Sequence, residues 1–340
     1  MDAKKSIHLI LILAIAAAGC SSAAKRESSA NSTPETPAGT NTGYYGPPAA
    51  PDGAPSAGAP SPSPTPAPEY GPQLPHVNAL VILVGPGMAR TFAAAGFLKV
   101  LEENHIPVGA VFGTEMGAFV SSLYGFSKSR NDFEWALQKL KPEIFTLAPS
   151  SFSFSKLIGK GRALTDLEKA ITAALGGKKL EEAKVQLRIG IFSETAGKGM
   201  LLDKGAADEA VRAALASPDT FEPVPIEAQP SHSCAFDCAF SVKEAKALGI
   251  GPVVVLDLAS EKPTKFSDRD SAYFSRVLKN AREVEEQMVG ADLIIRPELK
   301  DIGYFEFNRK STAAFAGAKA AKGALAKLRE MVAAPVEQKK

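Results

Sequence analysis

The sequence predicts an α/β domain with three layers, in which a mainly parallel central sheet is covered by helices on both faces. Several short apolar runs have no alternation of polar residues, which is typical of strands buried on both sides. Segments with the 3.6-residue period of helices lie between these runs. Strands that alternate with helices along a chain favour parallel pairing through crossover connections.

The first half of the domain should contain two strands and two helices. We expect a strand at 78–84 (NALVILV), the turn Gly85-Pro86-Gly87 and a helix at 89–104. A short buried strand follows at 108–112, and a helix begins at Met116. Trp135 lies further along, in NDFEWALQKL, and we expect it in the core, with a lipid-contacting rim residue as the alternative.

The second half should supply the remaining strands and two long helices. Apolar runs predict strands at 185–192, 252–258 and 291–295. We expect one long helix over 268–289 and an Ala/Lys-rich helix over 311–333. The folded domain is therefore placed at 76–333, with a disordered tail at 334–340.

The N-terminal segment reads as an export signal followed by a tether. Lys4 and Lys5 precede an apolar stretch at 7–18 that is too short to span a bilayer as a mature helix. Small residues lead into Cys20, which resembles the lipobox of bacterial lipoproteins, where the cysteine is lipidated after residues 1–19 are removed. Ordinary cleavage and secretion of a soluble protein is the alternative. Residues 20–75 are rich in Pro, Ala and Ser and should form a disordered tether.

These features predict a location and exclude one class of partner. The protein should be exported and anchored by lipidated Cys20 to the membrane of the cell envelope. Ser21 lacks the aspartate type of retention signal, which favours the outer membrane in a Gram-negative host. The formal net charge is only +2, without a long basic run, so the composition argues against nucleic-acid binding.

Two glycine-containing turns could carry chemistry. In the first, a buried strand runs into Gly113-Thr114-Glu115-Met116-Gly117 and a helix starts at once. This is the strand–turn–helix context of the nucleophile elbow G-x-S-x-G, in which the nucleophile sits at a helix N-terminus. The second turn, at 84–90, could aim backbone N–H groups at an oxyanion. Its spacing does not fit the nucleotide-binding pattern G-x-G-x-x-G, because position 90 is an arginine.

Together these turns and their order resemble the patatin-like phospholipase family. Segments 89–118, 205–224, 241–258 and 291–299 look like consecutive segments of that family, so the resemblance covers about 77–330. It implies a patatin-like three-layer fold. It also implies a glycine-rich oxyanion loop and a Ser–Asp dyad that acts on acyl lipids without histidine.

The catalytic positions depart from the family pattern. Glu115 stands at the nucleophile position, and Ser233 stands where the dyad aspartate is expected. The oxyanion-loop remnant consists of Gly85, Gly87, Met88 and Arg90, and Pro86 in that loop has no N–H to donate. The elbow glycines, Gly113 and Gly117, are present.

These departures predict a non-catalytic pseudo-hydrolase that binds an acyl lipid or a protein partner. A carboxylate is a poor nucleophile toward an unactivated ester. We expect Glu115 either to fill the oxyanion cradle or pair with Arg90, or merely to cap the helix. One alternative is a lipid acyl hydrolase with displaced groups, for example Asp237, and another is an interaction protein without a ligand pocket. Ser121 and Ser122 are interpreted as helix-packing residues, and no cofactor is called for.

A cluster of potential ligands follows the expected dyad position. His232, Cys234, Asp237 and Cys238 are residue types that suit zinc, but C-x-x-x-C within one loop is a weak metal signal. A Cys234–Cys238 disulfide, a pair of free buried thiols and a metal site all stay open, with the disulfide favoured in an oxidising compartment.

Overall fold

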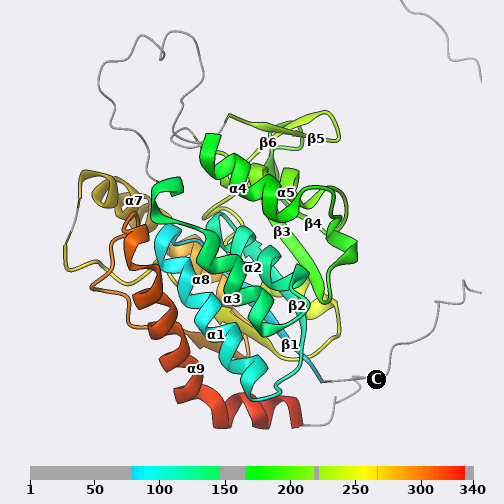
Figure 1. The fold of residues 1–340 in the computed structure, drawn as a ribbon, viewed down its shortest axis with the longest axis vertical. Helices are drawn as coiled ribbons and strands as arrows, with labels where there is room; N and C mark the ends of the chain where they lie inside the picture. Colours follow the sequence, from blue (N-terminus) through cyan, green and yellow to red (C-terminus); the bar gives the residue numbers. More distant parts are fainter. Residues whose placement is uncertain (1–77, 146–164, 218–221, 266, 334–340) are drawn as a thin grey trace, which may run out of the picture. The chain divides into compact units, whose positions relative to one another are not determined.

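A mixed sheet of eight strands forms the centre of the computed structural model (Figure 1), which describes residues 78–145, 165–217, 222–265 and 267–333. The strand order is β5-β6-β3-β2-β1-β7-β8, and β4 pairs with β3. The strands are β1 (Leu80–Val84), β2 (Val108–Thr114), β3 (Gln186–Ser193), β4 (Lys198–Leu202), β5 (Val224–Ile226), β6 (Gln229–His232), β7 (Val253–Leu256) and β8 (Leu293–Ile295). Neighbours from β3 through β2, β1 and β7 to β8 are parallel, whereas β4, β5 and β6 pair antiparallel at one side. The predicted α/β class with a mainly parallel sheet is confirmed.

Helices cover both faces of this sheet. The α-helices are α1 (Phe92–Glu103), α2 (Met116–Phe126), α3 (Arg130–Lys139), α4 (Thr165–Leu175), α5 (Ala207–Leu215), α6 (Val242–Ala247), α7 (Asp268–Lys279), α8 (Ala281–Met288) and α9 (Lys310–Ala333). Short 3-10 helices are η1 (Met88–Thr91), η2 (Pro142–Phe145), η5 (Leu180–Glu182) and η6 (Phe307–Arg309).

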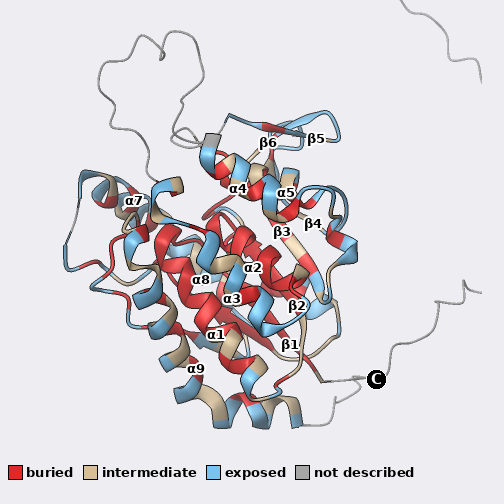
Figure 2. Ribbon diagram, viewed as in Figure 1, coloured by how far each residue is buried: buried red, intermediate tan, exposed pale blue. Residues whose placement is uncertain are grey.

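The strand β1 shows why the apolar runs lack alternation. Leu80, Ile82 and Val84 pack into a large core with α1, α2 and α9, and these three residues are 0–1% exposed. Val81 and Leu83 point to the opposite face, into a smaller core with α6. Successive side chains of a strand alternate between faces, so a strand covered on both sides needs apolar residues at every position. Figure 2 shows β1, β2, α1 and α2 as the buried centre.

The helices α1 and α9 cross at a pair of glycines. A Cβ added to Gly96 would lie 1.8 Å from the carbonyl oxygen of Ala314, and one added to Gly317 would lie 1.8 Å from that of Ala93. Two backbones that approach this closely leave no room for any side chain. The C-terminal helix is thereby fixed against the helix that follows the Gly85–Met88 turn.

Two expectations from the sequence are wrong. The helix predicted over 268–289 is interrupted at Asn280, which ends α7 and precedes α8. Its side-chain amide donates to the carbonyl oxygen of Arg276 at 2.8 Å and so competes with the helical backbone for that acceptor. Trp135 is not in the core, because its side chain is 63% exposed. Phe133 is the buried aromatic residue of α3, and a residue two positions later faces away from it.

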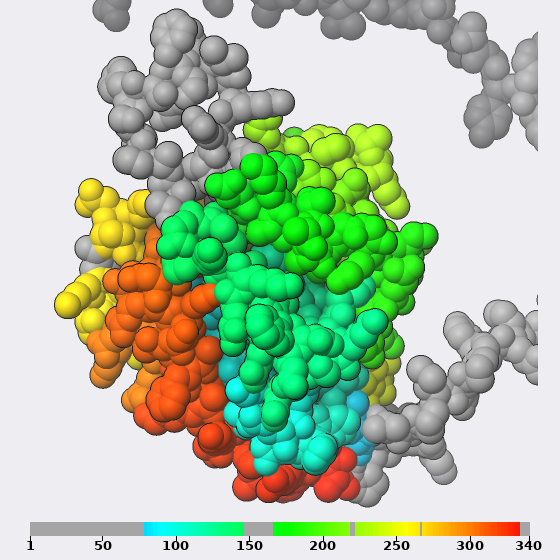
Figure 3. Space-filling view, viewed as in Figure 1, coloured from blue at the N-terminus to red at the C-terminus, as the bar shows by residue number. Residues whose placement is uncertain are grey.

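The space-filling view shows α3 and α9 next to each other on one face (Figure 3). Their contact includes Lys310, whose ammonium donates to the carbonyl oxygens of Leu137 and Leu140. The helix α9 occupies 310–333, as predicted.

The features predicted for the two ends of the chain lie outside the described residues. These are the export signal at 1–19, lipidated Cys20, the tether at 20–75, the start of the domain at 76–77 and the tail at 334–340. Within the described part of the chain, no helix combines the length and apolarity that a membrane span requires.

Candidate functional site

The turn between β2 and α2 has the backbone of a nucleophile elbow with a glutamate at its tip. β2 ends at Thr114, α2 begins at Met116, and Glu115 between them has φ 51° and ψ −128°. A positive φ is strained for a residue with a Cβ and costs on the order of 1–3 kcal/mol. The tight turn places Glu115 directly at the N-terminus of α2.

The two elbow glycines are required by close contacts. A Cβ on Gly113 would lie 2.5 Å from the carbonyl oxygen of Gly117. A Cβ on Gly117 would lie 2.7 Å from the carbonyl oxygen of Val84, at the end of β1. The glycine spacing therefore both permits the turn and brings it beside the Gly85–Met88 loop.

That loop donates two backbone hydrogen bonds to the Glu115 carboxylate. The N–H groups of Gly87 and Met88 both point at Oε2, at 2.9 and 3.1 Å. The N–H of Gly85 is engaged elsewhere, with the carbonyl oxygen of Leu256, and Pro86 has none. Met88 itself has a positive φ of 49°. Of the placements expected for Glu115, this arrangement matches the one in which its side chain occupies the oxyanion cradle.

Tyr273, on the buried face of α7, supplies a third donor. Its hydroxyl lies 3.0 Å from Oε1 and 2.9 Å from Oε2 of Glu115. The ring packs edge-on against Phe236 and Phe305 and is tilted against Tyr304, with centroids 5.7, 5.9 and 4.4 Å away. Glu115 and Tyr273 are only 6% and 4% exposed. The carboxylate is thus enclosed and held by three donors.

Burial and hydrogen bonding act on Glu115 in opposite directions. Burial raises the pKa of the Glu115 carboxyl, because removal from water penalises its charged form. The bonds from Gly87, Met88 and Tyr273, together with the positive charge of Arg276, lower that pKa without cancelling the effect of burial. Burial also raises the pKa of the Tyr273 hydroxyl well above its ordinary value, and the adjacent Glu115 charge adds to this rise.

Arg90 does not pair with Glu115, which corrects one of the two placements expected from the sequence. Its Nε donates to the carbonyl oxygen of Ile302 at 2.7 Å, and its Nη1 donates to that of Glu261. The guanidinium lies 4.2 Å above the ring of Tyr304. These partners hold the fully buried Arg90 side chain over the ring of Tyr304.

Ser233, at the expected position of the dyad acid, lies at the same pocket as Glu115. The pocket has a volume of about 30 Å³, which is room for on the order of two water molecules. It is lined by Met88, Glu115, Leu215, Ser217, Ser233, Tyr273, Arg276 and Phe305. Glu115 and Ser233, the positions that the sequence analysis assigned to nucleophile and acid, therefore line one pocket.

The other candidate groups lie outside this pocket. Ser122 donates to the carbonyl oxygen of Ala118 at 2.7 Å within α2, and Ser121 is fully buried in the same helix. Asp237 is exposed and is absent from the residues that line the pocket. Nothing in this arrangement displaces Asp237 toward Glu115.

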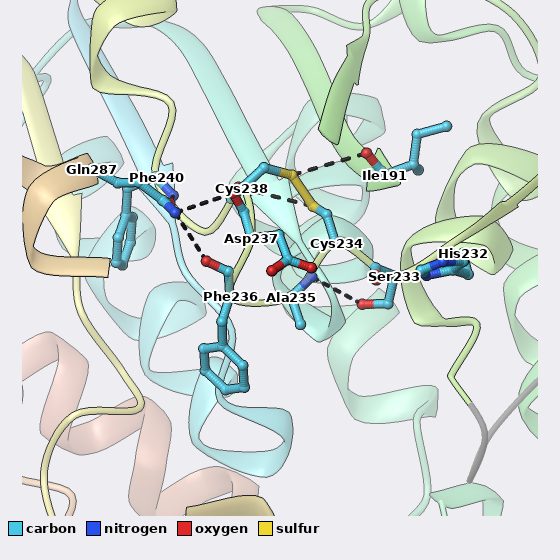
Figure 4. Close-up of a disulfide and its surroundings, with 10 residues drawn as sticks. All are labelled: Ile191, His232, Ser233, Cys234, Ala235, Phe236, Asp237, Cys238, Phe240 and Gln287. Carbon is cyan, nitrogen blue, oxygen red and sulfur yellow. Dashed lines mark hydrogen bonds between the residues drawn. A yellow bond between two sulfur atoms is a disulfide. The ribbon is translucent and has the colours of Figure 1, made fainter. Parts of the chain in front are cut away.

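Cys234 and Cys238 are joined by a disulfide whose Cα atoms are 5.5 Å apart (Figure 4). His232, the neighbouring potential ligand, stacks on Phe192 with ring centroids 4.9 Å apart. Among the residues that the structure describes, no group of three or more His, Cys, Asp or Glu side chains could hold a metal ion. In this structure, the two cysteines of the loop are bonded to each other.

The family model of patatin-like phospholipases matches residues 83–236. Over this range, which is just under half of the chain, the sequence is similar to patatin-like phospholipases. The matched range begins within β1 and contains the Gly85–Met88 loop, the elbow and Ser233. The match therefore covers five of the eight residues that line the pocket, whereas Tyr273, Arg276 and Phe305 lie beyond it.

Relatives within this family match only part of the chain. An uncharacterized NTE family protein of Mycobacterium tuberculosis is 24% identical over 144 residues, which cover 42% of this chain and 39% of that protein. Lysophospholipase NTE1 of Candida glabrata is 23% identical over 194 residues, 56% of this chain and 11% of that one. Human patatin-like phospholipase domain-containing protein 6 is 40% identical over 52 residues, 15% and 4% of the two chains. The chain spans less than half the length of these relatives.

Solved structures with a similar arrangement include two bacterial proteins. VipD from Legionella pneumophila gives a TM-score of 0.44 at 12% identity, over 76% of this chain and 67% of that one. ExoU from Pseudomonas aeruginosa, in complex with SpcU, gives a TM-score of 0.36 at 14% identity, over 75% of this chain and 53% of that one.

Two residues of the pocket were not foreseen from the sequence. Tyr273 and Arg276 lie in α7, and Tyr273 is 158 positions from Glu115. The pattern of α7 held a partial signal, because Asp270, Tyr273 and Val277 recur at helical spacing and form its buried face. That pattern indicates that the tyrosine faces the core, but it does not predict that its hydroxyl contacts Glu115.

Proposed function

We propose that this protein is a membrane-anchored member of the patatin-like family that does not hydrolyse esters and instead binds an acyl lipid or a protein partner. The observation that carries the proposal is the position of the Glu115 carboxylate on the N–H groups of Gly87 and Met88. Those donors are the ones that the family resemblance assigns to the developing oxyanion of an ester. A substrate carbonyl cannot use them while the carboxylate occupies them.

The chemistry of the nucleophile position leads to the same conclusion. Attack by serine gives an ester that water hydrolyses, whereas attack by the Glu115 carboxylate would give a mixed anhydride from an unactivated ester. Ser233 offers no carboxylate to accept a proton, and its Oγ accepts a hydrogen bond from the N–H of Ala235 at 3.2 Å. Loss of oxyanion stabilisation alone costs about 10²–10³-fold in rate for each donor.

The proposed anchor and partner follow from the sequence and from the size of the pocket. Cys20, after its short apolar segment, would carry the lipid and place the domain at the cell envelope, at the outer membrane in a Gram-negative host. A pocket of about 30 Å³ does not admit an acyl chain without movement of its walls. A lipid ligand would therefore have to move side chains such as Met88 or Phe305, whereas a protein partner could bind without entering.

Hydrolysis of a short-chain fluorogenic ester tests this proposal. The full chain and its Glu115→Ser/Ser233→Asp variant are compared, with Glu115→Gln as the control that keeps the side chain's shape but removes its charge. We expect no hydrolysis above background from wild type and from the control, and measurable hydrolysis from the double variant. Wild-type activity that is lost on substitution of a pocket residue would overturn the proposal.

The pocket supports one second candidate, a lipid acyl hydrolase with a relocated nucleophile. Ser217 and Ser233 both line the pocket beside Glu115. Among the described residues, these are the serines that line the pocket, so we place a relocated nucleophile at one of them, whereas Ser121 and Ser122 lie within α2. If wild type is active, Ser217→Ala and Ser233→Ala identify which hydroxyl attacks the ester.

A further inference from the structure

The loop that carries the disulfide also carries one residue of the pocket and one residue that packs against the pocket. Residues 233–241 connect β6 to α6, and Ser233 at the start of the loop lines the pocket. Phe236, at its centre, is 4% exposed and packs edge-on against Tyr273 with ring centroids 5.7 Å apart. Tyr273 in turn donates to both oxygens of Glu115. A continuous path of contacts thus joins the disulfide loop to the carboxylate.

The sheet provides a seat for the disulfide. A Cβ on Gly190 of β3 would lie 3.2 Å from each of the two sulfur atoms. A Cβ on Gly199 of β4 would lie 2.8 Å from the Cβ of Cys238. Two adjacent strands therefore lack side chains where the Cys234–Cys238 link packs, and the link holds the loop against the sheet.

Gln287, in α8, holds the other side of the loop (Figure 4). Its amide nitrogen donates to the carbonyl oxygens of Phe236 and Asp237 at 2.9 and 3.1 Å, and its Oε1 accepts from the N–H of Phe240 at 2.9 Å. These bonds do not depend on the disulfide. Ala235 is held at φ 33°, a conformation that alanine rarely adopts. A loop that is strained at this residue will relax when one of its two attachments is released.

We propose that the Cys234–Cys238 disulfide is a redox latch on the Glu115 carboxylate. In the oxidised protein the latch keeps Phe236 against Tyr273, and Tyr273 keeps Glu115 on the N–H groups of Gly87 and Met88. In the reduced protein the loop relaxes, Tyr273 loses this support, and the two N–H groups become accessible. The inference rests on these contacts and not on whether the protein hydrolyses esters.

A dithiol reductant completes the step without any other reagent. Its thiolate attacks the half-buried Cys238 sulfur, a mixed disulfide forms, and Cys234 leaves as a thiolate that takes up a proton. The second thiol of the reductant then attacks the mixed disulfide and releases Cys238. Two electrons pass to the chain, which gains two thiols, and the reductant becomes a disulfide.

Residue-resolved hydrogen exchange by NMR measures this latch directly. The full chain carries Cys20→Ser, so that Cys234 and Cys238 are its only cysteines. Treatment with dithiothreitol should raise the exchange rates of the Gly87 and Met88 amides at least tenfold. The amide of Gly85 is the internal control, because it bonds to the carbonyl of Leu256 and should keep its rate.

Two variants separate the latch from general loss of stability. Cys234→Ser/Cys238→Ser should show the fast exchange of Gly87 and Met88 with and without reductant. Phe236→Ala, which retains both cysteines, should also show fast exchange of the Gly87 and Met88 amides, whether the disulfide is oxidised or reduced. Unchanged exchange in a protein whose two thiols are shown to be free by alkylation would overturn the proposal. A rise of equal size at Gly85 and throughout α1 would also overturn it, because the disulfide would then be a global staple.

Discussion

Glu115 combines a strained backbone with a carboxylate that has three hydrogen-bond donors. In a nucleophile elbow a positive φ lets the nucleophile project from a sharp turn, and Glu115 has such a φ here. The sequence and its family resemblance offered the oxyanion cradle as one of several placements of Glu115, and the contacts with the N–H groups of Gly87 and Met88 are a finding of the structure. The sequence was not enough to predict Tyr273 or to exclude Arg90, because neither contact follows from local spacing.

Protonation of Glu115 should make the stability of the fold depend on pH. Its pKa is raised in the folded state, so the folded state binds this proton more tightly than the unfolded chain does. This contribution is complete below the ordinary carboxyl pKa of 4.5 and is lost as the pH rises through the folded-state pKa. We expect the free energy of unfolding in urea, from pH 4 to pH 8, to fall with pH relative to Glu115→Gln. A difference that stays constant or rises with pH would contradict the assignment.

Tyr273→Phe should destabilise the protein more than the matched change at Tyr304. The Tyr273 hydroxyl donates to a buried carboxylate, and such bonds contribute about 1.5–3 kcal/mol. The Tyr304 hydroxyl donates to the neutral carbonyl of Ala259, a bond that contributes about 0.5–1.5 kcal/mol. Urea unfolding at pH 7 of both phenylalanine variants measures the two losses. Equal losses would mean that Glu115 is not the charged acceptor.

At the scale of elements, the sequence predicted the helices and strands that have a regular apolar pattern. It missed a helix break and a hairpin that depend on single residues. The parallel strands and α9 follow from apolar patterning. The break at Asn280 does not, because the apolar pattern of α7 continues into α8. The hairpin β5–β6 was missed because each of its short strands contains a proline, and a proline in a sequence argues against a strand. The two prolines, Pro225 and Pro230, are paired with each other in the hairpin. The prolines are tolerated because β5 is the edge strand and because Pro230 lies outside the two residues of β6, Ser231 and His232, that pair with β3.

The crossing of α1 and α9 should be intolerant of any side chain at its contact. Gly317→Ala places a Cβ 1.8 Å from the carbonyl oxygen of Ala93, so the helices must separate, and we expect a loss of at least about 2 kcal/mol. Gly323→Ala, on the same helix with nothing within 4 Å, should instead stabilise α9 by about 0.5–1 kcal/mol. Thermal unfolding compares the two. If both variants shift the midpoint in the same direction, helix propensity rather than backbone contact decides the effect.

At the scale of the whole molecule, the arrangement of the pocket and its chemistry are separate questions. The elbow, the adjacent loop and the position predicted for the acid each contribute to one pocket, through Glu115, Met88 and Ser233. The residue types at those positions determine what the pocket can do, and fold membership alone does not. The resemblance drew attention to these positions, and their assignment to a former catalytic site stays a prediction.

Covalent labelling with a fluorophosphonate probe, read by mass spectrometry, tests this account most directly. The probe requires an activated serine beside oxyanion donors, so it reports both the nucleophile and the availability of the Gly87 and Met88 N–H groups. We predict that the wild-type chain is not labelled and that Glu115→Ser/Ser233→Asp is labelled at position 115. Labelling of the wild-type chain at any serine of the pocket would contradict the account, because a working nucleophile would then exist beside the occupied donors.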